Sequence, residues 1–381
     1  VAGITQLVAV VFRPVLARPH RQPLPNQAAF HESQTTRAIQ LLFGRTLRLD
    51  SRWEVLALTR FILAFIVMVG HENYFIDLLT GWSKFGLWLN QGSAVFGFLI
   101  ISGYSIAASL DRQPDGFFWR RVTRIYPTYI VAIVLAIAVS FLLKGKIIVA
   151  TGDNIPPPTF LEIFSTVFML QSFVSRPIPL AGQLWTVAIE WWNYILAPYF
   201  AKLKAIPLYI FGATSLLYNI TTCPPDASVL KYGLAFIAVS WYWVSGFLYY
   251  KHRKSPIGYV VLFTPVIMAS VSGTFVGRAV IIAVVAIALC EELPVGPKLS
   301  IIFRWLGDIS YPIYAYHVAV IFGLYSIGVH SSVILTCVVI TLSALSLHWI
   351  ERPIQGMMNK VKFPLIVFSY YKSRFLNRNH S

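Results

Sequence analysis

The chain has 381 residues, of which 57% are hydrophobic and only 12% are charged, and its mean hydropathy is +0.66. A soluble protein carries about twice that charged fraction, and the apolar runs here are long enough to span lipid. These totals exclude an ordinary soluble domain and predict an all-α, polytopic membrane protein. The formal net charge of +16 is better explained by cytoplasmic loops rich in Lys and Arg than by a nucleic-acid site.

The first 51 residues are rich in Arg, Gln, Pro and His and precede the long apolar runs. They predict a cytoplasmic tail that is largely disordered or interfacial, with one surface helix near "TTRAIQLLFGRTLRL". The opening apolar stretch has no charged start and no small-residue cleavage site after it, so a secretory signal is not expected. Residues 52–353 are expected to form one transmembrane domain, and residues 354–381 a short basic cytoplasmic tail.

About ten apolar segments follow in chain order, each near the 20 residues that a bilayer requires. We expect membrane-spanning helices at roughly 53–71, 91–110, 125–143, 184–201, 206–222, 229–250, 256–273, 277–290, 309–328 and 332–350. The stretch "PPPTFLEIFSTVFMLQSF" lies between the third and fourth segments and is shorter and interrupted. It predicts an interfacial or re-entrant segment.

The distribution of cations orients these segments. If the N-terminus is cytoplasmic, alternation places "DRQPDGFFWRRVTR", "KLK", "KHRK" and "KLSIIFR" inside, while the loops with few cations, such as "GVHSS", lie outside. The opposite orientation would put most Lys and Arg on the wrong side. Both termini are therefore expected in the cytoplasm.

The first span, "RFILAFIVMVGH", carries a cation and an imidazole at its two ends, Arg60 and His71. On a helix, eleven steps of about 100° bring His71 back to within roughly 20° of Arg60, about 16 Å further along. One interpretation is an arginine that reaches the interface and a histidine that caps the span. The other is functional, because a neutral imidazole can take a proton from a hydroxyl. We expect the Arg60 and His71 side chains not to contact each other and to lie at two points along one internal channel.

The start of the third span, "FFWRRVTRIYP", holds Arg120, Arg121 and Arg124. Arg121 and Arg124 are helix neighbours, and Pro127 is expected in the first helical turn. Clustered guanidinium groups near a helix start are suited to phosphate oxygens. The alternative is simple positive-inside anchoring.

Two further ionisable side chains lie inside apolar spans, Glu190 in "GQLWTVAIEWWNYILAPYF" and His317 in "WLGDISYPIYAYHVAV". A carboxylate within a membrane is costly, so Glu190 is expected to pair with Arg60 or a loop arginine, in a structural or a catalytic role. His317 is either a packing residue or a second site residue beside His71. The closing "HWIERP", with Glu351 and Arg352, predicts a structural clamp at the cytoplasmic face.

Several catalytic motifs are missing from the sequence. There is no GxSxG elbow, no HExxH, no Walker loop and no haem motif. No metal cofactor is therefore expected. The sequence also contains no pair of matched, glycine-broken half-helices, the pattern that would indicate an inverted-repeat transporter.

Taken in order, the segments resemble the acyltransferase 3 family of bacterial membrane proteins, from about Arg52 to Pro353. The resemblance rests on the Arg-x10-His of the first span and on "FGFLIISGYSI", "RRVTRIYP", "LWTVAIEWWNYILAPYF", "WLGDISYPIYAYH" and "IERP". It implies a ten-helix membrane enzyme that uses cytoplasmic acyl-CoA, most often acetyl-CoA, to acylate a hydroxyl, usually on a sugar.

The resemblance also implies roles for individual residues. His71 matches the catalytic base or acyl-relay residue and Arg60 its companion, and the implied catalytic set is His71, Arg60, Glu190 and His317. Arg121 and Arg124 match the family's arginine pair at the mouth of the acyl-CoA pore. Together with the adjacent Arg120 they form the implied acyl-CoA-binding set: Arg120, Arg121 and Arg124. The chain has "AIEWWNY" where many members have "VEEQFY". Glu190 is kept there, but Trp191 replaces a second acid, which leaves that position without an assigned role.

The resemblance sets the expected partners and location. They are acyl-CoA, a glycan or lipid-linked sugar acceptor and membrane lipids, with no nucleic acid, in the bacterial cytoplasmic (inner) membrane. The chain is expected to be a member without a fused periplasmic esterase-like domain, acylating exopolysaccharide, O-antigen or lipo-oligosaccharide. The alternative is a glycan transporter or flippase with His71, Glu190 and His317 as a proton relay. Consumption of acyl-CoA would distinguish the two.

Overall fold

The computed structural model describes residues 51–76, 84, 86, 88–143, 156–222, 234–272 and 278–360. All regular structure in these ranges is helical, and the described residues belong to one structural unit. This confirms the all-α prediction for the described part of the chain. The predicted N-terminal tail, and the C-terminal tail after Lys360, lie outside the described residues.

Each of the ten predicted spans contains a helix. These are α3 (Arg52–Ile76), α5 (Gln91–Arg112), α6 (Phe117–Leu143), α8 (Trp185–Lys202), α9 (Ala205–Thr222), α10 (Leu234–Lys251), α11 (Pro256–Ser272), α12 (Ala279–Leu289), α13 (Pro297–Ser326) and α14 (Ser332–Ser346). Four helical stretches are long and apolar enough to cross a membrane, namely Arg52–Glu72, Gln91–Arg112, Phe117–Leu143 and Ser332–Lys360. The chain thus has several membrane-type helices, and the total of ten spans stays a prediction.

Two helices begin earlier than predicted, because charged turns continue them beyond the apolar segment. Helix α6 starts at Phe117, so the arginine run forms its first turns and Pro127 lies inside the helix, not in the first turn. Helix α13 starts at Pro297, the first helical position, where a proline costs no hydrogen bond. A proline can also lie within a membrane helix, where its neighbours satisfy the freed carbonyl.

The segment predicted as interfacial or re-entrant contains a short helix, α7 (Phe160–Val167). Its N-cap Thr159 and Glu162 form a capping box, in which each side chain bonds the other residue's backbone N–H. After α7, Gln171 donates to the Tyr129 hydroxyl at 2.7 Å and to the Leu184 carbonyl at 3.0 Å. These bonds tie the segment to α6 and to the 3₁₀ turn η1 (Pro179–Leu184) that precedes α8.

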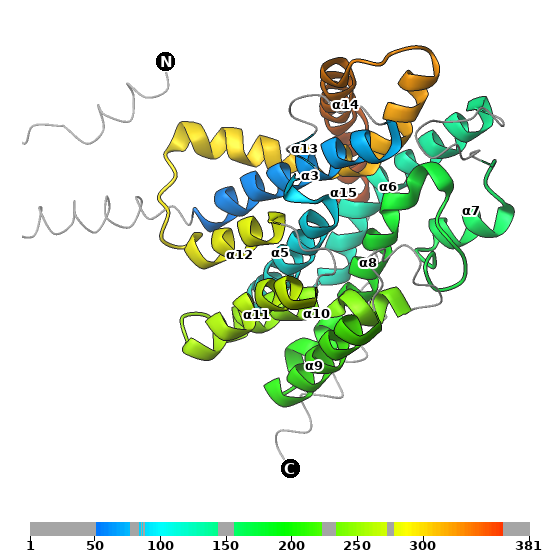
Figure 1. The fold of residues 1–381 in the computed structure, drawn as a ribbon. Coiled ribbons are helices and arrows are strands. Elements are labelled where there is room, and N and C mark those ends of the chain that lie inside the picture. Colours follow the sequence, from blue (N-terminus) through cyan, green and yellow to red (C-terminus); the bar gives the residue numbers. More distant parts are fainter. Residues whose placement is uncertain are drawn as a thin grey trace, which may run out of the picture. The chain divides into compact units, whose positions relative to one another are not determined.

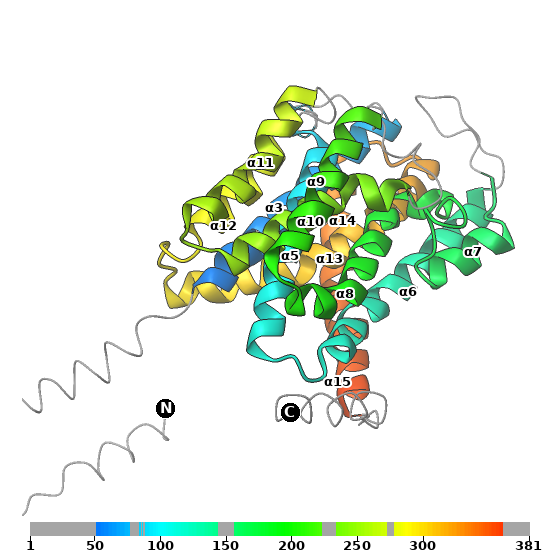
Figure 2. The ribbon, with the colours of Figure 1, turned by 90° about the horizontal axis from the view of Figure 1, so that it is seen from below.

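Helices α3 and α5 occupy the middle of the bundle in both views (Figures 1 and 2), α3 packing on α13 and α5 on α10. The α5–α10 crossing is close because glycines face each other's backbone. A Cβ added at Gly103 would overlap the Trp243 carbonyl, and one added at Gly246 would overlap the Ile100 carbonyl. Such small-residue contacts let membrane helices approach closely.

The C-terminal end of the described chain is held by a polar cluster. Helix α14 runs into a π-helical turn, η3 (Leu347–Glu351), and then into α15 (Arg352–Lys360). The buried Glu351 accepts hydrogen bonds from Tyr316 and Ser346, both at 3.3 Å. Arg352 pairs with Asp308 at 3.1 Å. These contacts join α13 to the end of α14, as the predicted clamp requires.

Candidate functional site

Two histidines from distant parts of the chain meet in the interior. His71, near the end of α3, places its Nδ1 3.0 Å from Nε2 of His317 on α13, across 246 residues of sequence. The ring centroids are 4.9 Å apart and the rings are inclined by 42°. His317 is fully buried. The structure therefore brings together two residues that the sequence could only name separately.

Each histidine is also bonded to its own helix. Nδ1 of His317 lies 3.1 Å from the carbonyl oxygen of Ile313 and 2.8 Å from that of Tyr314. Nδ1 of His71 lies 2.9 Å from the carbonyl oxygen of Val67. Backbone contacts on both sides thus fix the two imidazole rings in orientation.

The turn before α8 supports the histidine pair from the side. The Tyr314 ring lies 6.1 Å from the His317 ring, and its hydroxyl donates to the Gln183 carbonyl at 2.7 Å. The Gln183 side chain donates in turn to the Ala315 carbonyl at 2.7 Å. These bonds fix η1 against the part of α13 that carries His317.

A buried carboxylate, Glu72, directly follows His71. It is fully buried, and its two carboxylate oxygens accept hydrogen bonds from Ser332 and, at 3.0 Å, from Thr336. Both donors belong to α14, so the end of α3 is held by α13 through His71 and by α14 through Glu72. Glu72 was not predicted from the sequence, although a carboxylate adjoining a span is an unusual feature.

Arg60 lies on the same helix as His71 but bonds a different neighbour. Its guanidinium donates to the Ser105 hydroxyl of α5 at 2.6 Å, and Ser105 donates to the Ile101 carbonyl at 2.7 Å. Arg60 and His71 do not touch, as expected from their separation along α3.

Glu190 is bonded locally and not to an arginine. The Tyr194 hydroxyl, one turn further along α8, donates to the Glu190 carboxylate. Tyr194 also lies 3.1 Å from the Ser102 hydroxyl of α5. No ion pair within the described ranges joins Glu190 to an arginine, which differs from the predicted pairing. Glu190 does lie within electrostatic range of Arg60 and Arg121.

The three arginines of α6 have different surroundings. Arg120 donates to two backbone carbonyls, of Asp115 and Gln113, and so holds the turn before α6. Arg121 donates to the Ser109 hydroxyl at 3.1 Å, while its buried Nε has no partner. Arg124 is exposed, and in the described part of the chain no hydrogen bond or ion pair engages it. Arg121 and Arg124 therefore keep unused donors for a ligand.

A row of hydroxyls on α5 links these groups. Ser102, Ser105 and Ser109 are spaced by three and four residues, which places them on one helix face, over about 10 Å. They meet Tyr194, Arg60 and Arg121 respectively. The sequence signal was present in "SGYSIAAS" as serines at helical spacing within an apolar span.

The charges around this row are unbalanced. Arg60 lies within electrostatic range of Arg121 and Arg124, and the carboxylate in range of it is that of Glu190. The described electrostatic neighbours of Arg60 thus include two guanidinium groups and one carboxylate, that of Glu190. Tyr314 lies within electrostatic range of Glu190 and beside His317, so it neighbours both this carboxylate and the histidine pair. The arrangement favours an anionic ligand near the arginines.

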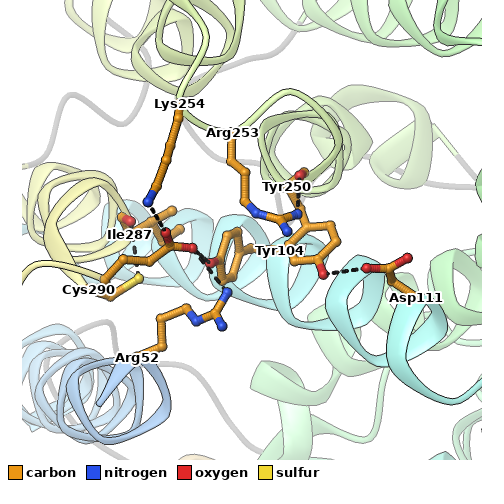
Figure 3. Close-up of polar contacts among 9 residues, drawn as sticks. Arg52, Tyr104, Asp111, Tyr250, Arg253, Lys254, Ile287 and Cys290 are labelled. Atoms are coloured by element: carbon orange, nitrogen blue, oxygen red, sulfur yellow. Dashed lines mark hydrogen bonds and ion pairs between the residues drawn. The ribbon is translucent and has the colours of Figure 1, made fainter. Parts of the chain in front are cut away.

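A separate polar cluster fastens the ends of neighbouring helices, as the close-up shows (Figure 3). Glu291, just after α12, pairs with Arg52 of α3 at 3.0 Å and with Lys254 of the α10–α11 loop at 3.1 Å. Beside it, Tyr250 at the end of α10 donates to Asp111 of α5 at 2.8 Å. The cluster thereby connects α3, α5, α10 and α12 at one end of the bundle. Arg52 and Lys254 are paired with the Glu291 carboxylate, and Arg253 donates to the Tyr250 backbone carbonyl at 3.1 Å, which indicates a structural role.

Metal ligands are not gathered in the part of the chain that the structure describes, where no group of three or more His, Cys, Asp or Glu side chains is placed to hold an ion.

Comparisons with known proteins point to one family. The family model for an acyltransferase domain, that of acyltransferase 3, matches residues 54–350. The chain is also 26% identical over 242 residues to a protein of Acidianus two-tailed virus named as a candidate acetyltransferase, ORF330, with 58% of this chain and 70% of the viral protein covered. No solved structure matches the chain significantly. Since the match covers the helices that carry both the histidine pair and the arginine group, the chain belongs to the acyltransferase 3 family and is an acyltransferase with several membrane-type helices.

Proposed function

We propose that the protein transfers an acyl group, acetyl in the first instance, from cytoplasmic acyl-CoA to a hydroxyl of a cell-surface or exported polysaccharide, O-antigen or lipo-oligosaccharide. The observation that carries this proposal is the contact between His71 and His317, 3.0 Å apart in the interior. An imidazole held this way is suited to take a proton from a hydroxyl. The name of the viral relative supports acetyl as the group transferred.

The donor would be bound through its phosphates. Arg121 and Arg124 have free donors near the start of α6, and guanidinium groups bind phosphate oxygens with charge-assisted hydrogen bonds. The distribution of Lys and Arg supports a cytoplasmic position for this end of α6, which is the side where acyl-CoA is found. The pantetheine arm would then extend past Ser105 and Arg60 toward the histidine pair.

The chemical step follows from this placement. The acceptor hydroxyl gives its proton to His71 as its oxygen attacks the thioester carbonyl carbon, and an O–C bond forms. The C–S bond breaks, and the thiolate of CoA takes the proton back from the imidazole. The products are an ester and free CoA thiol, so protons and electrons balance without an oxidant or a reductant.

The location and acceptor are parts of the same proposal. Ten spans with both termini cytoplasmic would put the protein in the bacterial inner membrane as a multi-pass enzyme, with the histidine end of α3 on the far side from the arginines. A glycan or lipid-linked sugar would approach from that side. The family resemblance supports a sugar as the acceptor.

The test is consumption of acyl-CoA by purified protein in lipid vesicles, with acetyl-, propionyl- and butyryl-CoA offered separately and host glycan added as acceptor. We expect CoA thiol to be released with one of the donors and label from the acyl group to appear on the glycan. If none of these donors is consumed while labelled glycan crosses the vesicle membrane, the protein is a transporter and the proposal is wrong.

A further inference from the structure

The hydrogen bonds around the histidine pair determine which nitrogen of each ring carries a proton. From them we infer that Nε2 of His71 is the atom that takes the proton of the acceptor hydroxyl, and that His317 is a positioning residue that fixes His71 in that tautomer. This inference rests on the proposed acyl transfer and assigns the atoms that perform it. It also gives His317 a role distinct from direct chemistry.

Nδ1 of His317 lies 3.1 Å from the Ile313 carbonyl oxygen and 2.8 Å from that of Tyr314. Carbonyl oxygens only accept hydrogen bonds, so Nδ1 of His317 carries the proton and donates to them. In a neutral imidazole the other nitrogen then holds a lone pair. Nε2 of His317 is therefore an acceptor, and it faces His71.

Nδ1 of His71 likewise lies between two acceptors. The Val67 carbonyl oxygen is 2.9 Å away, and Nε2 of His317 is 3.0 Å away. One N–H on Nδ1 satisfies them together as a bifurcated donor. A proton on Nε2 of His317 would instead set two donors against each other. The lone pair of the neutral His71 ring consequently lies on Nε2, the nitrogen turned away from His317.

This arrangement suits a base inside an apolar bundle. When Nε2 of His71 accepts the hydroxyl proton, the ring becomes an imidazolium whose Nδ1–H still points at the lone pair of His317. In serine hydrolases a carboxylate plays the orienting part, but a second buried charge would be expensive here. A neutral histidine orients the base without that charge. The neighbouring carboxylate, Glu72, is bonded to Ser332 and Thr336.

The kinetic test compares two substitutions at His317. A glutamine side chain can still present an oxygen to Nδ1 of His71, whereas leucine cannot. We expect His317→Leu to lower kcat at least tenfold, within the roughly 10²- to 10⁴-fold range of general-base catalysis, with KM for acyl-CoA unchanged. His317→Gln should restore most of kcat. His348→Leu is the matched control, because His348 makes the same bond to its own helix but is exposed.

A spectroscopic test keeps the inference independent of turnover. The chain has 8 histidines, and ring ¹⁵N spectra of His71→Asn and His317→Gln proteins assign the two sites by the signals that vanish. We expect both rings to be neutral with the proton on Nδ1. A His71 signal with the proton on Nε2, or equal kcat for His317→Leu and His317→Gln, would overturn the inference. Failure of the wild type to consume acyl-CoA would instead refute the proposed function, while the spectra would still decide the tautomers.

Discussion

At the scale of single residues, Glu72 is a fully buried carboxylate whose described hydrogen bonds come from two hydroxyl groups. An apolar side chain here would remove the acceptor of the Thr336 hydroxyl and one hydrogen bond of the Ser332 hydroxyl. A buried polar group that loses its hydrogen bond costs about 1–3 kcal/mol. We therefore expect Glu72→Leu to lower the free energy of unfolding by that amount and Glu72→Gln to lower it less.

Unfolding of the detergent-solubilised protein by denaturant measures the difference. Thr341→Val is the control, since Thr341 lies on the same helix as Ser332 and is exposed. If Glu72→Leu were as stable as Thr341→Val, Glu72 would not hold α3 to α14.

Residue types were predictable from the sequence at this scale, but contacts were not. Ionisable side chains within apolar spans identified His71, Glu190 and His317 as unusual residues. Which of them meet depends on helix packing across 246 residues, and no local pattern encodes that. The predicted ion pair of Glu190 with an arginine was replaced by a bond from Tyr194, because a hydroxyl one turn away on the same helix is a closer donor.

Among the secondary-structure elements, α7 gives a pH-dependent prediction. Burial raises the pKa of Glu162, but hydrogen bonds from Arg176 and from Thr159 lower it by more, so its pKa lies below the ordinary value of 4.5. A depressed carboxylate pKa contributes stability above the unfolded value and loses it as the pH falls through the folded value. Glu162→Gln should thus cost about 1 kcal/mol at pH 7, as for lost helix caps, and progressively less as the pH falls below 4.5.

Hydrogen exchange at the amides of α7, compared between wild type and Glu162→Gln at both pH values, measures this effect. A penalty that is the same at pH 7 and at pH 3.5 would show that the charge of Glu162 does not support the helix.

The crossing of α5 and α10 gives a second prediction for the elements. Because a Cβ at Gly103 or Gly246 would overlap a backbone carbonyl of the other helix, Gly103→Ala and Gly246→Ala should force the helices apart and destabilise the protein by at least the roughly 1–3 kcal/mol of an overpacked core. Gly323→Ala is the control, since its Cβ would meet only Val139 at 3.6 Å. Midpoints of thermal unfolding in detergent should separate the three variants, and equal midpoints would contradict the packing.

The existence and order of the helices were predictable because apolar runs of about 20 residues require a helical backbone in lipid. The residues at which the helices begin were less predictable. Helices α6 and α13 both extend into charged turns that hydropathy alone assigns to loops. The hydroxyl row of α5 has a recognisable spacing, but its meaning appears only when Arg60 and Tyr194 are seen opposite it.

For the whole molecule, the orientation in the membrane is the first prediction. The positive-inside distribution predicts that the loop at Lys204 is cytoplasmic and that the loop at His330 is outside. In a variant whose native cysteines are replaced by serine, Lys204→Cys should react with a membrane-impermeant reagent only in inverted vesicles, and His330→Cys only in intact cells. The reverse pattern would turn the donor side of the proposed reaction outward.

The central claim is that one end of the bundle binds the acyl donor and the other performs the transfer. It is tested most directly by measuring acetyl-CoA binding and turnover in parallel for wild type, Arg121→Ala and His71→Asn, with the exposed Arg278→Ala as control. Loss of a charge-assisted hydrogen bond costs about 1.5–3 kcal/mol, so we expect Arg121→Ala to bind at least about tenfold more weakly. His71→Asn should bind as wild type does and lose turnover about 100-fold or more. Undiminished turnover in His71→Asn, or wild-type binding in Arg121→Ala, would contradict the account.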